Sequence, residues 1–248
     1  MKKVLVVGAS GATGKLLVQQ LLQQGIKVVA ILRTTSTLLQ TVDTKTNLHI
    51  VRANISDMSK YDLGLHLEGC DAVFSCLGHN LTFKGIFGKP RLLVTETIEK
   101  ISRVIESINA DKKVKIVLMN TTGNSNRDIP EQLPLSQRCI VSLLRLLLPP
   151  HVDNEAAADF LRLHVGQTHK YIEWVVVRPD GLIDENNVTE YDIYPSPTRN
   201  PIFDAGQTSR INVANFMSNL VINLELWDTW KGKMPVIYNQ ALCEREQI

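Results

Sequence analysis

Short runs of consecutive aliphatic residues recur along the chain, and longer stretches with regularly spaced apolar positions separate them. The runs are continuous instead of alternating, which is typical of strands buried on both faces of a parallel sheet. The sequence therefore predicts buried strands at Lys3–Val7, Lys27–Leu32, Leu48–Arg52, Ala72–Cys76, Lys115–Met119 and Trp174–Val177.

The separating stretches repeat their apolar residues every three or four positions, as one face of a helix does. They predict helices at Gly14–Gln24, Arg91–Asn109, Asp153–His164 and Asn212–Leu224. Gly25 is a natural stop for the first of these helices, and Asp153 is expected to cap the third. Strands that alternate with helices predict an α/β fold of Rossmann type, because right-handed crossovers place helices on both faces of a doubly wound parallel sheet.

Two segments depart from this alternation. Asp184–Thr208 is rich in Pro, Asn, Tyr and Thr, and we interpret it as irregular structure over the carboxyl edge of the sheet, where substrates bind in this architecture. Cys139–Pro150 is rich in leucine, but it ends at two prolines, well short of the ~20 residues that a membrane span needs. It is interpreted as an apolar helix packed on the domain or on a second subunit, which leaves monomer and homodimer open. We expect one domain over residues 1–248, with substrate-side elements at about 124–152 and 184–208.

The net charge and the spacing of the cysteines limit which binding partners and metal sites are expected. A formal net charge of +2 exerts no long-range attraction on nucleic acid or on an anionic membrane, so the expected partner is a small-molecule substrate. No two cysteines form a C-x-x-C pair, which argues against a zinc knuckle or a thioredoxin-type redox site. Isolated thiols fit a reducing cytosol, and the apolar run Val4–Val7 is too short for the core of a signal peptide. We expect a cytoplasmic protein without a bound metal.

The strongest motif joins the first predicted strand to the first predicted helix and reads GASGATG. Gly8 lets the chain turn off the strand, Gly11 leaves room for a pyrophosphate, and Gly14 lets the helix pack closely on the sheet. Free N–H groups and the helix dipole then attract the anion. A glycine triad also occurs in ordinary βα turns, but its place at the first βα junction favours dinucleotide binding. The predicted cradle comprises Gly8, Ser10, Gly11, Ala12, Thr13 and Gly14.

The end of the second predicted strand decides between NAD and NADP. An NAD site offers an acidic side chain there to the ribose hydroxyls, whereas this chain reads Arg33-Thr34-Thr35-Ser36. The Arg33 guanidinium can pair with a 2′-phosphate, and Thr34 or Ser36 can add hydroxyl donors. A solvated surface arginine is the alternative. The sequence thus predicts NADP(H) as the cofactor, in preference to NAD(H).

The G-x-x-G-x-x-G spacing resembles that of the short-chain dehydrogenase/reductase superfamily. Further motifs, in their order, resemble an atypical, NAD(P)H-binding, NmrA-like group that includes the biliverdin-IXβ/flavin reductases. These motifs are Asn54-Ile55, Cys76-Leu77-Gly78, Thr121-Thr122-Gly123, Val177–Gly181 and Ser209–Ala214, so the resemblance spans roughly residues 1–224. It implies that Asn54 and Ile55 flank the adenine, that Leu77 and Gly78 line the ribose, and that Cys76 and Pro179 also belong to the cofactor site. Relatives usually carry Asp at the position of Asn54.

The catalytic pair of the superfamily is missing. Ordinary members use a Y-x-x-x-K pair in which the Tyr donates a proton, but this chain contains no Y-x-x-x-K, and Pro150 and Asn154 fall on the two positions. The remaining candidates are Thr121 or Thr122, at the serine-like position, and His151, which is able to supply a proton near neutral pH. A solvated histidine beside a Pro-Pro turn is an equally good interpretation of His151.

Two functions from different classes fit these features. The first is an NADP(H)-dependent oxidoreductase that transfers hydride to a small conjugated or flavin/quinone-like acceptor, because such acceptors need alignment more than a proton donor. The second is a non-catalytic, NADP-binding, redox-sensing regulator, which the NmrA-like branch also contains. The segment Tyr191–Phe203 is more typical of a pocket lid than of a docking face, which favours the enzyme. The missing Tyr/Lys pair disfavours an epimerase or dehydratase of nucleotide sugars.

Overall fold

The computed structural model describes residues 1–33, 47–79, 88, 90–109, 112–131, 145, 147–201 and 203–240. Its central sheet has eight strands in the order β3-β2-β1-β4-β5-β6-β10-β8. All neighbouring strands run parallel except β8, which pairs antiparallel with β10. Their bounds are β1 Lys3–Val7, β2 Lys27–Leu32, β3 Leu48–Arg52, β4 Ala72–Ser75, β5 Val114–Met119, β6 Ile172–Pro179, β8 Tyr191–Tyr194 and β10 Val236–Asn239.

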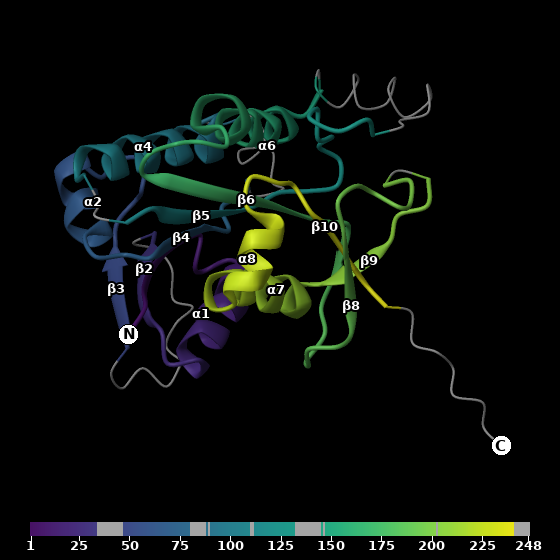
Figure 1. Cartoon of the computed structure of the whole chain (residues 1–248), viewed down its shortest axis with the longest axis horizontal. Helices are drawn as coiled ribbons and strands as arrows, with labels where there is room; N and C mark the ends of the chain where they lie inside the picture. The colour runs from purple at the N-terminus through teal and green to yellow at the C-terminus, as the bar shows by residue number, and fades with distance from the viewer. Residues whose placement is uncertain are drawn as a thin grey trace.

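Helices cover both faces of this sheet, as Figure 1 shows. On one face lie α2 (Lys60–Leu67), α4 (Leu93–Ser107) and α6 (Pro149–Phe160), which continues into a π-helical turn at Leu161–Val165. On the other lie α1 (Ala12–Gln23), α7 (Arg210–Ile222) and α8 (Leu224–Trp230). A second, two-stranded parallel sheet joins β7 (Gly181–Ile183) to β9 (Gln207–Ser209). The predicted doubly wound α/β fold is confirmed.

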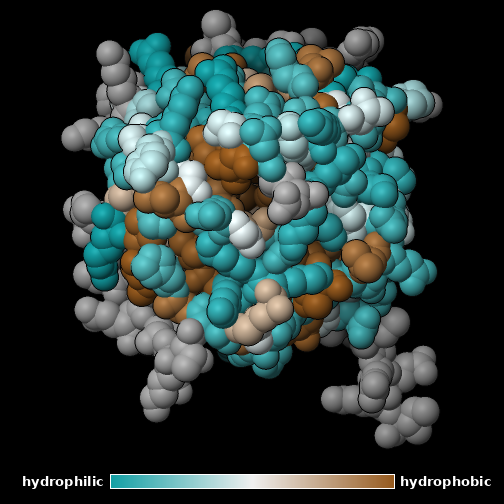
Figure 2. All heavy atoms as spheres, turned by 60° about the vertical axis from the view of Figure 1, so that its left-hand side comes forward, coloured by the Kyte–Doolittle hydropathy of each residue, from teal (hydrophilic) through white to brown (hydrophobic). Residues whose placement is uncertain are grey.

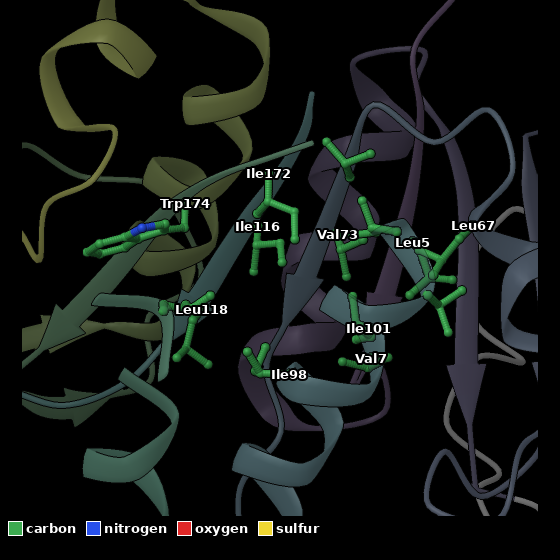
Figure 3. Close-up of a cluster of buried hydrophobic side chains, with 14 of the residues drawn as sticks. Leu5, Val7, Leu67, Val73, Ile98, Ile101, Ile116, Leu118, Ile172 and Trp174 are labelled. Carbon is green, nitrogen blue, oxygen red and sulfur yellow. The ribbon is translucent and has the colours of Figure 1, made fainter. Parts of the chain in front are cut away.

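The continuous apolar runs follow from this three-layer arrangement. In β1, Leu5 and Val7 join the core cluster beneath α4, whereas Val4 and Val6 join the cluster beneath α1 and α7. Each of these four side chains is fully buried. Figure 3 shows the first cluster, in which Leu5 and Val7 lie among side chains from α2, α4 and the neighbouring strands. A strand with two buried faces has no position left for a polar residue, so its sequence does not alternate.

Several short elements have no counterpart among the predicted ones: the helices α2 and α8 and the strands β7, β8, β9 and β10. The apolar pattern of α2 is weak, because Leu63 and Leu67 are buried while Tyr61 and Leu65 are exposed. Strand β10 contains only four residues, and it pairs with β6 and β8, which lie far from it in sequence. Short elements of this kind carry too little periodicity to be distinguished from loops.

The expectation that Asp184–Thr208 is irregular is wrong in part. Strand β8 lies in the middle of this segment and extends the sheet beyond β10, and β9 begins near its end. Tyr191 of β8 donates a hydrogen bond of 2.8 Å from its hydroxyl to Asn215 of α7. The tyrosines that suggested a loop over the site therefore belong to an edge strand, where aromatic residues are common.

The predicted start of the third helix is also wrong. Helix α6 begins at Pro149, and both of its first two residues are prolines, which lack the N–H that would go unbonded there. Asp153 thus lies inside the helix and does not cap it. The predicted leucine-rich helix at Cys139–Pro150 lies mostly outside the described residues. Of that segment, the structure describes Arg145 and Leu147–Pro150.

Figure 2 shows one face, on which apolar side chains gather around a hollow and hydrophilic ones cover much of the remainder. None of the helices in the described part of the chain is long and apolar enough to cross a membrane.

Candidate cofactor site

The order of the strands places a crevice at the carboxyl edge of the sheet. From β1 the chain proceeds to β2 and β3 on one side and then returns to β4 on the other side. Loops that follow β1 and β4 therefore diverge, and ligands of doubly wound sheets bind at this switch point. A cavity of about 590 Å³ lies there. Its walls come from the turn after β1, the ends of β2 to β5, the start of α4, and Leu182 and Arg210 on β7 and α7.

The turn after β1 is built to approach an anion closely. Gly8 has a φ of +73°, and a Cβ atom there would lie 2.5 Å from the carbonyl of Cys76. A Cβ on Gly14 would lie 2.2 Å from the Gly8 oxygen, so α1 packs against the turn without a side chain between them. Gly11 precedes α1 and gives it no side-chain cap, which leaves the N–H groups of the first helical turn for a ligand.

The predicted cofactor residues meet at this cavity with two exceptions. Gly8, Ser10, Gly11, Ala12, Thr13, Arg33, Asn54, Ile55, Cys76, Leu77 and Gly78 all line it. Gly14 packs behind the turn, and Pro179 ends β6, where its carbonyl accepts a hydrogen bond of 3.0 Å from the Thr122 amide. Thr34 and Ser36, the other predicted parts of the phosphate clamp, lie outside the described residues. Contact of each lining residue with a cofactor stays a prediction.

The charges on the cavity wall are positive. Arg33 and Arg210 line it, and no carboxylate belongs to its described lining. The thiol of Cys76 adds no negative charge, because burial raises its pKa to about 12. Asn54, at the position where relatives usually carry Asp, donates from its side chain to the Asp57 carboxylate at 2.9 Å. Such a wall suits a ligand with several phosphate groups.

The buried carboxylate of Asp153 supports one side of the cavity. His79 follows β4 and lines the cavity, and its Nε2 lies 2.8 Å from Asp153 Oδ2. Asp153 is fully buried, and its two oxygens also accept from the amides of Val94 and Thr95 at 2.8 and 2.9 Å and from the Thr95 hydroxyl at 2.7 Å. Asp153 therefore caps α4, although it belongs to α6, and ties both helices to the cavity wall.

The three predicted catalytic residues lie beside the cavity and are not part of its lining. Thr121 and His151 approach each other around Gly123, where a Cβ atom would lie 3.7 Å from Thr121 Oγ1 and 3.6 Å from His151 Cε1. Thr122 is buried, and its hydroxyl donates to Asp180 Oδ1 at 3.0 Å. Their catalytic roles remain predictions.

His151 is less exposed than a residue beside a Pro-Pro turn would be, because the prolines begin a helix that contains it. Its side chain is 10% exposed, and its Nε2 lies 3.8 Å from Glu155 Oε1. Burial lowers the pKa of His151, Glu155 opposes that shift, and Arg145 adds to it. His151 is therefore mostly neutral at pH 7. Burial raises the pKa of Glu155, but Arg145, His151 and Arg127 outweigh this effect and lower it.

A fully buried arginine holds the substrate-side segments onto the sheet. Arg178 of β6 donates to Glu131 Oε1 at 2.7 Å and to the carbonyls of Asn124, Met234 and Pro195 at 2.9, 2.7 and 3.2 Å. The loop after β5 and the end of β8 are thereby attached to one rigid side chain. Among the described residues, no group of three or more His, Cys, Asp or Glu side chains is placed to hold a metal ion.

Comparison with known proteins agrees with this site. Residues 8–223 match the NAD(P)H-binding family. A search of curated proteins found no match. Similar solved structures include the oxidoreductase ylbE from Lactococcus lactis, at 18% identity, a TM-score of 0.66 and coverage of 96% of this chain and 91% of that one. A proposed NADH-flavin reductase from Streptococcus pneumoniae has 18% identity and a TM-score of 0.65, with 97% and 100% coverage.

A third similar structure is a short-chain dehydrogenase/reductase from Veillonella parvula in complex with NADP. It has 12% identity and a TM-score of 0.69, with 97% of this chain and 95% of that one covered. At such low identities the likeness establishes the fold alone. The match over residues 8–223 confirms the predicted NAD(P)H-binding group.

Proposed function

The chain belongs to the NAD(P)H-binding family, and from that premise we propose that it is an NADP(H)-dependent oxidoreductase. Its acceptor is a small conjugated or flavin/quinone-like molecule. One observation carries this proposal: the described lining of the cavity holds two arginines and no carboxylate, at a site whose glycine turn leaves helix N–H groups unbonded. The similar structures are those of an oxidoreductase, a proposed NADH-flavin reductase and a short-chain dehydrogenase/reductase, which supports the same proposal.

In this proposal the cavity residues have different roles according to where they lie. The amides of the turn from Gly8 to Thr13 bind the diphosphate, and Arg33, at the end of β2, pairs with the 2′-phosphate. When bound, the nicotinamide supplies a hydride. The apolar side chains of Leu77, Met119 and Leu182 line the cavity and exclude water from the acceptor. Because Pro150 and Asn154 replace the Tyr/Lys pair, the chain orients an acceptor that is already a good electron sink.

The test of this proposal is a screen of NADPH oxidation by the purified full chain against flavins, quinones and conjugated carbonyls. We expect one of these classes to be reduced. The matched control is Gly11→Val: a Cβ atom there would lie 3.3 Å from the Gly8 carbonyl oxygen, within the turn that is proposed to hold the diphosphate, so oxidation should be lost while the circular dichroism spectrum is kept. Turnover that survives in a folded Gly11→Val variant would exclude the glycine turn as the cofactor cradle.

The choice of NADP over NAD has its own test. Arg33→Ala should weaken NADPH binding by about 1–3 kcal/mol, the range for charge-assisted hydrogen bonds, and should barely change NADH binding. Arg199→Ala is the control, because Arg199 forms an exposed ion pair with Asp204 and does not line the cavity. Equal losses of both cofactors in Arg33→Ala would contradict the assignment of Arg33 to the 2′-phosphate.

One observation favours a second candidate, a non-catalytic, NADP-binding regulator. None of Thr121, Thr122 and His151 belongs to the described lining of the cavity. A regulator needs the cofactor site but no acceptor beside it. If NADPH binds tightly and no acceptor in the screen is reduced, the regulator becomes the better account.

A further inference from the structure

Arg210 is a cationic side chain on the cavity wall formed by β7 and α7, apart from the glycine turn. It is the first residue of α7, and it lines the cavity together with Leu182 of β7. Its side chain is 25% exposed, and its Nη1 lies 2.9 Å from Asp184 Oδ1. The Asp184 side chain is 82% exposed, so the counter-ion of Arg210 lies in solvent.

Polar contacts between α1 and α7 fix where Arg210 lies relative to the glycine turn. Gln20 donates from Nε2 to the Ile211 carbonyl at 3.0 Å, and Asn215 donates to Gln20 Oε1 at 3.1 Å. One turn later, Gln24 Nε2 lies 3.4 Å from Ser218 Oγ. The two helices therefore run parallel, and Arg210 lies beside the middle of α1, one residue before the contact of Ile211 with Gln20.

The start of α7 is itself well anchored. Ser209 caps the helix, since its hydroxyl accepts from the Asn212 amide at 3.3 Å, and Asn212 is fully buried. Asn212 donates in turn to Asn239 Oδ1 and to Thr189 Oγ1, both at 2.8 Å. Side chains on a helix lean toward its N-terminus, so the Arg210 side chain is directed toward the end of α1 that follows the glycine turn.

Replacing Asp184 by a phosphate group as the counter-ion of Arg210 costs little free energy. An exposed ion pair contributes only about 0–1 kcal/mol, whereas guanidinium–phosphate bonds in a partly enclosed cavity are charge-assisted and can be bidentate. NADPH carries phosphate at two separate places, the ribose 2′-position and the diphosphate. The cavity offers two arginines, Arg33 at the end of β2 and Arg210 beside α1.

We infer that Arg210 binds the diphosphate of the cofactor from the α7 wall, and that Asp184 holds the guanidinium in place until the diphosphate displaces it. This role concerns cofactor binding, so it is independent of the acceptor and of whether the protein is an enzyme. The two arginines then have different roles. Arg210 contributes to the affinity for any nicotinamide dinucleotide, and Arg33 contributes to the preference for NADP(H) over NAD(H).

Calorimetric titration of the full chain tests this division with three ligands: NADPH, NADH, and adenosine 2′-monophosphate, which has the 2′-phosphate but no diphosphate. We expect Arg210→Ala to weaken NADPH and NADH alike by about tenfold, equivalent to ~1.4 kcal/mol, and to leave adenosine 2′-monophosphate unchanged. Arg33→Ala should show the opposite pattern, with NADPH and adenosine 2′-monophosphate weakened and NADH kept. Arg199→Ala, from an exposed Arg–Asp pair outside the cavity lining, should change none of the three.

Asp184→Asn removes the competing carboxylate and keeps Arg210. We expect it to tighten both dinucleotides by roughly two- to fivefold, within the range of an exposed ion pair. Arg210→Gln provides a second variant without the charge, in case Arg210→Ala alters the fold. Wild-type affinity for both dinucleotides in folded Arg210→Ala or Arg210→Gln would overturn the inference. So would a loss confined to NADPH, or weaker binding in Asp184→Asn.

Discussion

The burial of Asp153 leads to a quantitative prediction about stability. Its carboxylate is fully buried and accepts four hydrogen bonds, from the Val94 and Thr95 amides, the Thr95 hydroxyl and the His79 ring. In Asp153→Asn one of the two acceptor oxygens becomes an NH₂ group that faces a backbone amide, so the amide of Val94 or of Thr95 loses its acceptor and stays buried, and the other bonds lose the negative charge that strengthens them. A hydrogen bond to a charged group is worth ~1.5–3 kcal/mol, and a buried donor without an acceptor costs about 1–3 kcal/mol.

We therefore expect Asp153→Asn to lower the free energy of unfolding, measured by urea titration, by about 3–5 kcal/mol. Thr95→Val removes only the hydroxyl contact and should cost about 1–2 kcal/mol. Asp128→Asn is the matched control, because Asp128 pairs with Arg162 at 2.6 Å but its side chain is 45% exposed, which predicts a loss of about 1 kcal/mol or less. If Asp153→Asn were no more destabilising than Asp128→Asn, then Asp153 would not be the cap that joins α4 to α6.

Two further predictions concern chemistry and thiols. If the protein is an enzyme, stopped-flow measurements should show hydride transfer slowed by about 10²-fold in Thr121→Val, Thr122→Val or His151→Gln. Tyr→Phe should slow it by less than about tenfold at each of Tyr171, Tyr191, Tyr194 and Tyr238. A Tyr variant that slowed it by about 10⁴-fold would place the active site elsewhere. Burial raises the pKa of Cys70 to about 11 and of Cys76 to about 12, so at pH 8 iodoacetamide should label both thiols after unfolding and not before, as resolved by peptide mass spectrometry. Rapid labelling of the folded protein at pH 8 would contradict the raised pKa values. The thiols of the unfolded chain ionise near pH 9.0 and those of the folded chain do not, so the free energy of unfolding should fall as the pH rises from 9.0 toward 11.

The buried strands could be predicted well because their two-sided burial leaves a strong signal. The runs at β1 and β2 begin and end where the structure has them. Strand β3 also has the predicted bounds, but the prediction that it is buried is wrong, because it forms an edge of the sheet and none of its residues is buried. Strand β6 is longer than its apolar centre, because it also includes Arg178 and Glu173, which are polar but bonded. Arg178 satisfies its donors with carbonyls from segments remote in sequence, and no local pattern reports that.

The residues of the glycine turn and Arg33 could be predicted as cavity residues from the sequence, whereas Arg210 and His79, on the other walls, could not. The glycine turn and Arg33 act through backbone geometry and charge at a known strand end, so a linear motif is sufficient to locate them. Arg210 required the parallel packing of α1 on α7, and His79 required the partner that lies in α6. Asp153 was predicted as a cap from its position before an apolar pattern, and it is a cap, but for a helix that begins about sixty residues earlier.

Helix α6 has a structural role that bears on the proposed mechanism. Pro149 and Pro150 are its first two residues, where a residue without an N–H is favoured, and the Asn154 carbonyl accepts from Asn120 at 2.9 Å. The face of α6 that turns toward α4 carries Asp153, whose carboxylate fastens His79 to the cavity wall. Through Asp153, helix α6 holds α4 and the wall of the cavity in place. A rigid wall without a tyrosine is suited to acceptors that require alignment, and that is the physical reason to search among flavins and quinones before simple carbonyls.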